Sequence, residues 1–487
     1  MALYEHFPYT NFHELNLADL MAAVKELEEI IGQFNGDIDA AVAAYISQHP
    51  EIMITPDSVY TAALQDGAVT KEKVDPALGV DYVTPQMYKT PDNTWRDAFN
   101  AALDSGMDVF VPTANGEQYI IDGPAPIVSQ GITIPQPALI WPNSGCKRLF
   151  GSDSVWRTVS TSGAIVFRPY NDASSENQPF IQLQGGAHGL RISNLRFVRS
   201  GGYGNNTTGI GLDALYDTTS ADKDLIITNS CFNDFHTGIA FGGRGLQVYD
   251  STFSSGQYAA RIQWPNAFGT DDNGSRGIVF SGCRFHVNNY ADIWVQSGHA
   301  HGLNVTGCYK DRRTTGGRTF IRADSQAWGW NISGNSLIGL YASGTNLNTI
   351  EFMGGAVGCT ISGNTFQGFP DDADGTHRGP LAAIYFGGGT VNGVVISGNS
   401  FYRIRQHCVR IQDCTSFRGL VFTGNSCNIS SSASSYGGVY LGINTLADEF
   451  VVMGNRMDLL GSSPRVYVKN NNQPAPTNLV LANNITI

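Results

Sequence analysis

Charged residues are scarce in this sequence. Asp, Glu, Lys and Arg make up 15% of its 487 residues, whereas an average soluble chain carries about 25%. The surfaces of helices are usually covered by charged side chains, so this scarcity argues against a mainly helical protein. Glycine is abundant, at 56 residues. Together with many β-branched and aromatic residues, it indicates short strands that turn often.

Other absences narrow the class of protein. The sequence has no run of about 18 apolar residues, so we expect no membrane-spanning helix. Its first residues, MALYEH, lack the basic start and the apolar stretch of a secretion signal. Lys and Arg number 30 against 42 acidic residues, for a net charge of −12. Nucleic acid is therefore not an expected partner, because its phosphates attract basic surfaces.

The eight cysteines form no CxxC pair and no zinc-ligand spacing. Most of them lie in apolar, strand-like segments, so we expect buried free thiols, as in a protein made in a reducing cytoplasm. We predict no metal and no cofactor. The acidic stretch DDADG at 371–375 has carboxylates that could hold calcium, but a solvated surface turn is the favoured interpretation.

The first 50 residues differ from the rest. Apolar residues recur there at alternating spacings of four and three, from Leu20 to Tyr45. This heptad pattern predicts a helical segment, residues 1–50, that self-associates, and bulky residues in the seam favour a trimer. The alternative is one amphipathic helix packed on its own domain, which Gly32 and Gly36 would weaken. Residues 51–82, with prolines and polar residues, are expected to form a linker.

The most specific signal is an internal repeat of eight residues, exemplified by WNISGNSL at Trp330 and VVISGNSF at Val394. The first of eleven copies begins at Leu190. A second short strand, in which apolar and polar residues alternate, precedes each copy. Such a unit cannot bury its own apolar face, so the units must stack, with like residues about 4.8 Å apart. We therefore predict an all-β protein, a right-handed parallel β-helix of about eleven coils over residues 180–487. Residues 83–179 are expected to open it with a short helix at 94–103 and the first strands.

Two positions of the repeat predict ladders inside the coils. The sixth position is asparagine in most later copies. The asparagine side-chain amide can hydrogen-bond to the next coil, and the asparagine backbone tolerates the left-handed bend between strands. The eighth position is often phenylalanine, which is expected to stack. The asparagines are Asn335, Asn364, Asn399, Asn425, Asn455 and Asn484, and the phenylalanines are Phe197, Phe232, Phe253, Phe285, Phe366 and Phe401.

Three stretches resemble known proteins. VTPQMY followed by TWRDAFNAALDSGMDVFVPTANGEQYIID is similar to the start of pectate-lyase-like β-helices, although the usual glycine- and aspartate-rich stretch before the helix is missing. The SGN-x-F coils resemble those of bacteriophage tailspikes, and PYTNFHELNLADLMAAVKELE with DGAVTKEKV resembles virion-attachment segments of phage tail proteins. The resemblance implies a homotrimer of the phage virion, made in the host cytoplasm and joined through its N-terminus to a tail or baseplate protein. It also implies a receptor-binding protein that recognises, and often cleaves, bacterial surface polysaccharide.

Candidate site residues follow from aligning the strands that precede each repeat copy. Alternate residues of a strand face outward, which predicts one column of outward side chains on neighbouring coils. Aromatic faces stack on sugar rings, and arginines bind carboxylates and hydroxyls. The predicted substrate-binding residues are therefore Arg261, Trp294, Arg322, Tyr385 and Arg410, with Gln296 in the next outward column.

Three carboxylates on these strands are the candidate catalytic residues. Glycoside hydrolysis needs two carboxyl groups that flank the bond. Glu351 and Asp324 lie one coil and two residues apart, so their Cα atoms should be about 8 Å apart, within the roughly 6.5–9.5 Å range of inverting enzymes. Arg322 beneath Glu351 should favour its ionised form, so Glu351 is the predicted base. Asp324, or Asp292 one outward step before Trp294, is then the acid.

The sequence leaves other interpretations open. The column could simply solvate an exposed sheet or line a trimer contact in a non-catalytic glycan-binding adhesin. A polysaccharide lyase could use Arg322, Arg410 and Tyr385, whereas the missing secretion signal and the heptad pattern disfavour a secreted pectinase. A second cluster, Asp271 and Asp272 with His299 and His301, resembles that of polygalacturonases without its lysine. His188 and His301 are better explained as turn residues before strands.

Overall fold

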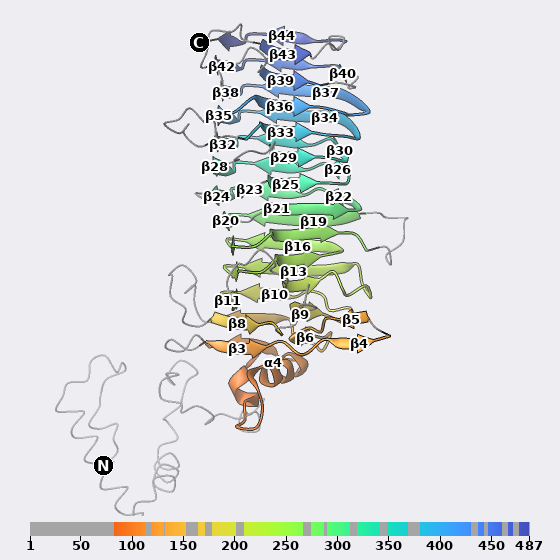
Figure 1. The fold of residues 1–487 in the computed structure, drawn as a ribbon, viewed down its shortest axis with the longest axis vertical. Coiled ribbons are helices and arrows are strands. Elements are labelled where there is room, and N and C mark those ends of the chain that lie inside the picture. The colour runs from red at the N-terminus through yellow and green to blue at the C-terminus, as the bar shows by residue number, and fades with distance from the viewer. Residues whose placement is uncertain are drawn as a thin grey trace, which may run out of the picture. The chain divides into compact units, whose positions relative to one another are not determined.

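The structure is a computed structural model. It describes residues 82–112, 118–130, 132–151, 164–170, 178–200, 209–265, 274–286, 290–311, 319–340, 348–368, 380–429, 437–442, 447–459, 466–470 and 477–486. The predicted N-terminal helical segment lies outside these residues, as does nearly all of the predicted linker. Within them the chain forms stacked coils of parallel strands, a parallel β-helix, with the short helix at one end (Figure 1). None of the described helices is long and apolar enough to cross a membrane.

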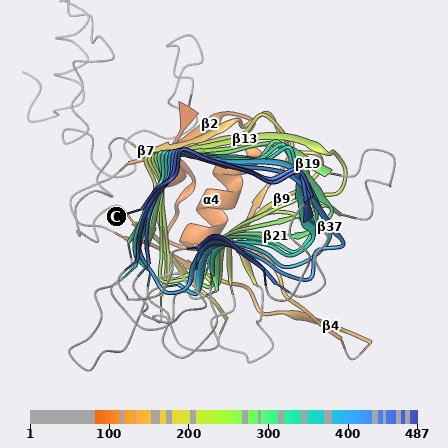
Figure 2. The same ribbon diagram turned by 90° about the horizontal axis from the view of Figure 1, so that it is seen from above.

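Each coil contributes strands to three parallel sheets, which form the sides seen along the axis of the coils (Figure 2). Sheet 1 has 18 strands. They are β1 (Tyr82–Val83), β2 (Asp108–Val111), β7 (Arg148–Gly151), β10 (Arg191–Ser193), β13 (Asp222–Thr228), β16 (Arg244–Tyr249), β19 (Gly274–Ser281), β22 (His299–His301), β23 (Asn304–Thr306), β26 (Ala327–Trp328), β27 (Asn331–Ser333), β30 (Gly355–Val357), β31 (Thr360–Ser362), β34 (Thr390–Ser397), β37 (Ser416–Thr423), β40 (Ala447–Asp448), β41 (Val451–Met453) and β44 (Val480–Ala482).

Sheet 2 has 13 strands and follows sheet 1 along each coil. They are β3 (Tyr119–Asp122), β8 (Ala164–Arg168), β11 (Arg196–Arg199), β14 (Cys231–Asn233), β17 (Thr252–Ser254), β20 (Arg284–His286), β24 (Tyr309–Asp311), β28 (Ser336–Leu340), β32 (Thr365–Gly368), β35 (Ser400–Ile404), β38 (Ser426–Ile429), β42 (Arg456–Leu459) and β45 (Ile485–Thr486).

Sheet 3 has 12 strands and carries the candidate site. They are β6 (Leu139–Trp141), β9 (Pro179–Leu183), β12 (Ile210–Ala214), β15 (Thr237–Phe241), β18 (Tyr258–Gln263), β21 (Ala291–Ser297), β25 (Thr319–Ala323), β29 (Asn348–Phe352), β33 (Ala382–Phe386), β36 (His407–Ile411), β39 (Gly437–Leu441) and β43 (Val466–Asn470). The prediction of paired strands was wrong in one respect: each eight-residue copy contains two strands, so a coil has three. The first strands of all three sheets precede residue 180.

Helix α4 (Trp95–Asp104) closes the end of the first coil. It begins and ends one residue later than the helix predicted at 94–103. Thr94 caps it, because its side chain accepts a hydrogen bond from the Asp97 N–H and the Asp97 carboxylate reaches back to Thr94. The apolar face of α4, including Phe99 and Leu103, is fully buried. A short 3-10 helix, η5 (Pro85–Tyr88), precedes it. An antiparallel hairpin, β4 (Ile127–Ser129) and β5 (Ile132–Ile134), projects from the coils (Figure 2).

The bend between sheets 1 and 2 depends on the fifth residue of the repeat. This residue has a positive φ, as at Asn194 (56°), Asp250 (47°) and Gly398 (63°), a conformation that glycine, asparagine and aspartate tolerate best. The expectation that the sixth-position asparagine takes this bend was therefore wrong. The hydrogen-bonding part of the expectation is confirmed, because the Asn364 amide donates to Asn399 Oδ1 at 2.9 Å and to the Ile332 carbonyl at 2.9 Å.

The predicted phenylalanine column stacks inside sheet 2. Ring centroids are 5.4 Å apart between Phe232 and Phe253 and 5.7 Å between Phe253 and Phe285. Parallel pairing then places Lys310, not an aromatic residue, on the next coil. All eight cysteines are buried free thiols, as expected. The interior of the coils is thus apolar, with a few polar side chains that must find partners there.

Candidate functional site

The predicted outward column is present in sheet 3. Parallel register pairs Arg261 with Trp294, Trp294 with Arg322, and Arg322 with Glu351. It continues from Glu351 to Tyr385 and from Tyr385 to Arg410, on strands that can be followed from β21 to β36 in Figure 1. Beyond these residues the register pairs Arg410 with Tyr440 at one end and Ala240 with Arg261 at the other.

Arg322 joins two of the predicted catalytic residues. Its Nε donates to Asp324 Oδ1 at 2.7 Å, and its Nη1 lies 3.3 Å from Glu351 Oε2. Because the nitrogens of one planar guanidinium are close together, the two contacted oxygens lie within about 8 Å of each other. The structure therefore brings Glu351 and Asp324 together on one face, around a shared guanidinium.

Glu351 is nearly buried, with 6% of its surface exposed. Burial raises the pKa of Glu351, although the Asn348 amide, which donates to Oε1 at 3.1 Å, and the Arg322 guanidinium both stabilise the ionised form. The Arg322 guanidinium acts in the expected direction, toward the ionised form that would suit a base, but desolvation outweighs it and the net shift of the pKa is upward. A carboxyl group with a raised pKa is suited to donating a proton.

Asp324 is more exposed than Glu351, and both of its oxygens are engaged. Oδ1 accepts from Arg322, and Oδ2 accepts from Trp294 Nε1 at 2.8 Å. The side chains of Asp324 and Arg322 are each about a quarter exposed, at 27% and 26%. The pair thus combines one buried carboxyl group with a raised pKa and one partly exposed carboxyl group that is ion-paired with Arg322.

Trp294 belongs to an aromatic cluster beside the two carboxyl groups. Its ring stacks on Tyr258 at 4.8 Å and lies 5.8 Å from Tyr290, while Arg322 lies 5.5 Å from the centre of the Tyr290 ring. Burial also raises the pKa of Tyr258 to about 12, so this phenol stays neutral. Tyr258 and Tyr290 were not among the predicted residues. Tyr258 is the first residue of β18, and Tyr290 directly precedes β21. Both therefore lie before the alternating residues from which the outward column was predicted.

Asp292 does not lie on this face. It is 1% exposed and forms an ion pair with Lys310 Nζ inside the coils. The predicted outward orientation was wrong because the strict alternation breaks where each sheet-3 strand begins. Phe320, opposite Asp292 in the next coil, also points inward and contacts the ring of Phe285. Asp292 therefore offers no exposed carboxyl group to a polymer.

The remaining predicted binding residues surround the carboxyl pair. Arg410 lies between the rings of Tyr385 and Tyr440, 5.7 and 5.9 Å from their centres, and its Nη2 donates to Gln412 Oε1 at 2.5 Å. Arg261 lies on the other side of Trp294 in the column. Gln296 is half-buried at an irregularity of β21, where Gln263 pairs with Ser297 instead.

The other sequence candidates do not form a comparable site. Asp271, Asp272 and the DDADG stretch at 371–375 lie outside the described residues. His301 stacks on Trp328 at 6.0 Å in sheet 1, away from the sheet-3 column. Within the described residues, no group of three His, Cys, Asp or Glu side chains could hold a metal ion.

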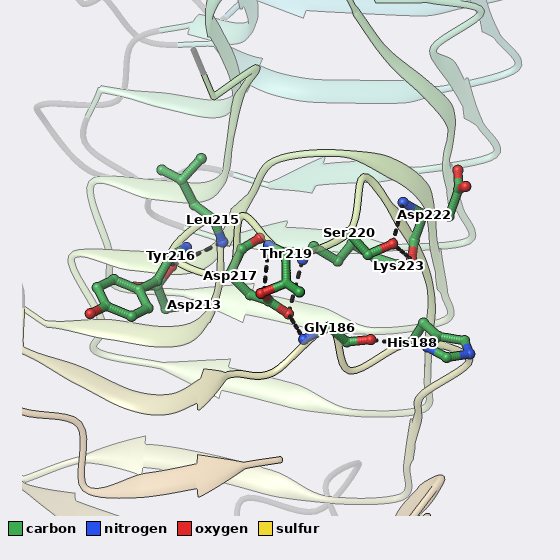
Figure 3. A network of polar contacts seen from close by, with 10 residues as sticks. All are labelled: Gly186, His188, Asp213, Leu215, Tyr216, Asp217, Thr219, Ser220, Asp222 and Lys223. Carbon is green, nitrogen blue, oxygen red and sulfur yellow. Dashed lines mark hydrogen bonds and ion pairs between the residues drawn. The ribbon is translucent and has the colours of Figure 1, made fainter. Parts of the chain in front are cut away.

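A second polar network anchors the connection between β12 and β13 (Figure 3). Asp217 and Lys223 form a buried ion pair of 3.2 Å, and Asp217 accepts from the backbone N–H groups of Gly186 and Thr219. Nearby, Asp213 accepts from the N–H groups of Leu215 and Tyr216. These contacts fasten one coil to the preceding one, so we assign this network to the fold.

Comparison with known proteins supports the architecture. No protein-family model matches the chain, and no curated protein matches it. Among solved structures, it is similar to DFA-IIIase from Arthrobacter chlorophenolicus A6 in complex with GF2, with 10% identity and a TM-score of 0.52 over 77% of this chain and 94% of that one. This likeness shows a shared fold.

Phage proteins are also among the structural neighbours. A mutant tailspike protein of E. coli bacteriophage HK620, in complex with a pentasaccharide, has 13% identity and a TM-score of 0.43 over 90% of this chain and 71% of that one. Tailspike protein 3 of bacteriophage CBA120 has 14% identity and a TM-score of 0.41 over 90% and 68%. The fold and the site thus define a parallel β-helix protein with a carboxyl pair and aromatic residues on one sheet face.

Proposed function

We propose that this chain is a bacteriophage tailspike that binds bacterial surface polysaccharide along the outer face of sheet 3 and cleaves it by glycoside hydrolysis. The observation that carries the proposal is the contact of Arg322 with both Asp324 and Glu351, one an ion-paired carboxylate and the other a buried carboxyl group with a raised pKa. Two carboxyl groups in such different environments are what acid–base cleavage of a glycosidic bond needs.

In the proposed mechanism, Glu351 donates its proton to the oxygen of the leaving sugar. Asp324, which accepts hydrogen bonds from Arg322 and Trp294, takes a proton from the water that attacks the anomeric carbon. The C–O bond to the leaving group breaks as the bond to water forms, and the pair ends with the proton moved from Glu351 to Asp324. This assignment reverses the roles expected from the sequence and keeps the same two residues.

The same proposal includes the setting of the protein. A homotrimer in the phage tail, attached through its N-terminal segment to a tail or baseplate protein, follows from the resemblance of the SGN-x-F coils and the N-terminal stretches to those of tailspikes. The aromatic cluster of Tyr258, Tyr290 and Trp294 supports sugar binding, since aromatic faces pack on sugar rings.

The test is depolymerisation of a panel of purified capsular and O-antigen polysaccharides from gut bacteria, followed by size-exclusion chromatography. We expect shortening of one of them, lost with Glu351→Gln and with Asp324→Asn. Glu449→Gln is the matched control, because Glu449 is exposed and pairs with Arg418 near sheet 1. Binding without shortening would replace the hydrolase by an adhesin, and products with unsaturated uronate ends would identify a lyase. Shortening that survives both site variants would refute the assignment of Glu351 and Asp324.

A further inference from the structure

The three arginines of the sheet-3 column differ in how their charge is balanced. Arg322 contacts two carboxyl groups. Among the described residues, neither Arg410 nor Arg261 takes part in an ion pair, although the chain as a whole carries a net charge of −12. Two uncompensated cations therefore stand on the same face as the carboxyl pair, where an acidic chain would be expected to place acidic partners.

Arg410 is held rigidly with donors to spare. Tyr385 and Tyr440 lie against its guanidinium, at 5.7 and 5.9 Å from the ring centres, and Gln412 accepts from Nη2. Its Nε is buried with no hydrogen-bond partner. Aromatic faces stabilise a guanidinium without using its N–H groups. The side chain is thus oriented in advance. Its buried Nε cannot reach a ligand, so the Nη N–H groups that do not donate to Gln412 are the donors left for something outside the chain.

Arg261 also forms no ion pair among the described residues, although its charge acts on Asp213. The nearest acidic residue of its column is Asp213, two coils away across Ala240, a distance of about 10 Å. Asp213 is occupied by the N–H groups of Leu215 and Tyr216, and the Arg261 Nε is buried with no hydrogen-bond partner.

The positions of these arginines relative to Glu351 matter. Arg410 lies two coils from Glu351 on one side, and Arg261 lies three coils away on the other. These steps correspond to about 10 and 14 Å along the column. A polymer lying along the column with its scissile bond at Glu351 and Asp324 would present sugars on both sides of that bond to an arginine.

We propose that sheet 3 selects an acidic polysaccharide, and that Arg410 binds the anionic substituent of one sugar, with Arg261 binding a second. The substituent is a uronate carboxylate or a sugar phosphate, since a guanidinium binds either with paired, charge-assisted hydrogen bonds. This inference rests on the proposed function, whose site it extends.

The experiment measures binding of three small probes to the full-length protein by calorimetry and saturation-transfer NMR. They are methyl β-D-glucuronoside, glucose 6-phosphate and neutral methyl β-D-glucoside. We expect at least one acidic probe to bind about tenfold or more tightly than the glucoside, because a charged acceptor strengthens the hydrogen bonds. The stronger acidic probe distinguishes carboxylate from phosphate recognition. In Arg410→Gln the preference should be weakened, in Arg410→Lys it should be partly kept, and in the double variant Arg410→Gln with Arg261→Gln it should be lost.

Arg418→Gln is the charge-matched control, since Arg418 is an exposed arginine of sheet 1 that pairs with Glu449. It should keep the preference for the acidic probe. Equal binding of all three probes, a preference that is unchanged in Arg410→Gln, or one that survives the double variant would overturn the inference. The depolymerisation assay separates this from the proposed function. Cleavage without an acidic preference removes only the inference, and an acidic preference without cleavage removes only the hydrolase.

Discussion

Glu351 shows how burial can outweigh a neighbouring charge at a single residue. Arg322 lies 3.3 Å from its carboxylate, a pairing that the sequence alignment anticipated. The degree of burial could not be anticipated, because it comes from packing with the neighbouring strands β25 and β33, which are distant in the sequence. The register of the strands decides which residues lie in the sheet-3 column, and the sequence predicts it. The direction of a pKa shift depends instead on how much water the folded chain leaves around the group.

The raised pKa of Glu351 predicts the pH dependence of cleavage. A general acid acts while protonated, so kcat/KM should fall on the alkaline side at a pH above the usual glutamic acid pKa of about 4.3. Glu351→Gln should remove this alkaline limb and lower kcat by about 10²–10⁴-fold. Arg322→Gln should move the limb to higher pH, because Arg322 stabilises the ionised form. A limb that stays in place in both variants would contradict the role of Glu351.

The ion pair of Asp292 and Lys310 inside the coils predicts a stability effect. Asp292→Ala leaves the Lys310 ammonium buried without its partner, so the free energy of unfolding should fall by about 3–5 kcal/mol. The double variant Asp292→Ala with Lys310→Met removes both charges and should recover part of this loss. Denaturant unfolding followed by circular dichroism measures both. A double variant no more stable than Asp292→Ala would show that the pair has another role.

The coil is the element whose structure the sequence predicts best. Apolar alternation located the sheet-3 strands, and the spacing of the asparagines located the ladder that joins the coils. The third strand of each coil was missed, although the copy carries a signal for it: its apolar residues step by three across the corner, as from Ile192 to Leu195, where a continuous strand would step by two. The inward position of Asp292 was missed for a related reason, since alternation fails where a strand leaves a corner.

The corner itself gives a prediction at this scale. Gly398 has a φ of 63°, and a Cβ added to it would come no nearer than 4.0 Å to the Gly363 backbone nitrogen. Any cost of substitution is therefore conformational. Gly398→Asn should be mild, since Asn194 and Asn229 occupy this position in earlier coils with φ of 56° and 46°. Gly398→Val should lower the free energy of unfolding by about 1–2 kcal/mol. Its melting temperature should therefore be lower than that of the wild type. Equal melting temperatures would refute the conformational explanation.

The whole molecule combines a sequence-predicted fold with a proposed assembly. The parallel β-helix explains why charge is scarce, because its stacked interior and corners use Ser, Thr, Asn and Gly where a helical protein would use Lys and Glu. It also explains why the charged residues of sheet 3 are conspicuous. The trimer rests on the heptad pattern from Leu20 to Tyr45, which lies outside the described residues.

The proposed trimer predicts a mass three times that of one chain in sedimentation analysis of the full-length protein. Leu27→Asp and Ile31→Asp together place charge in the seam and should shift the protein toward smaller species. Glu28→Gln, on the flank of the seam, should leave the mass unchanged. A wild-type protein that sediments as a monomer would contradict the trimer and leave the sheet-3 site to a single chain.

The asparagine ladder tolerates unequal coils. Successive ladder asparagines are 29, 35, 26 and 30 residues apart from Asn335 to Asn455, yet the bonds between their amides stay at 2.9–3.1 Å. Differences in chain length are thus absorbed in the connections outside the ladder. Such a scaffold can gain or lose residues beside sheet 3 while the hydrogen-bonded ladder of its interior stays in register. Evolution can therefore remodel the connections around the candidate site while keeping the same core.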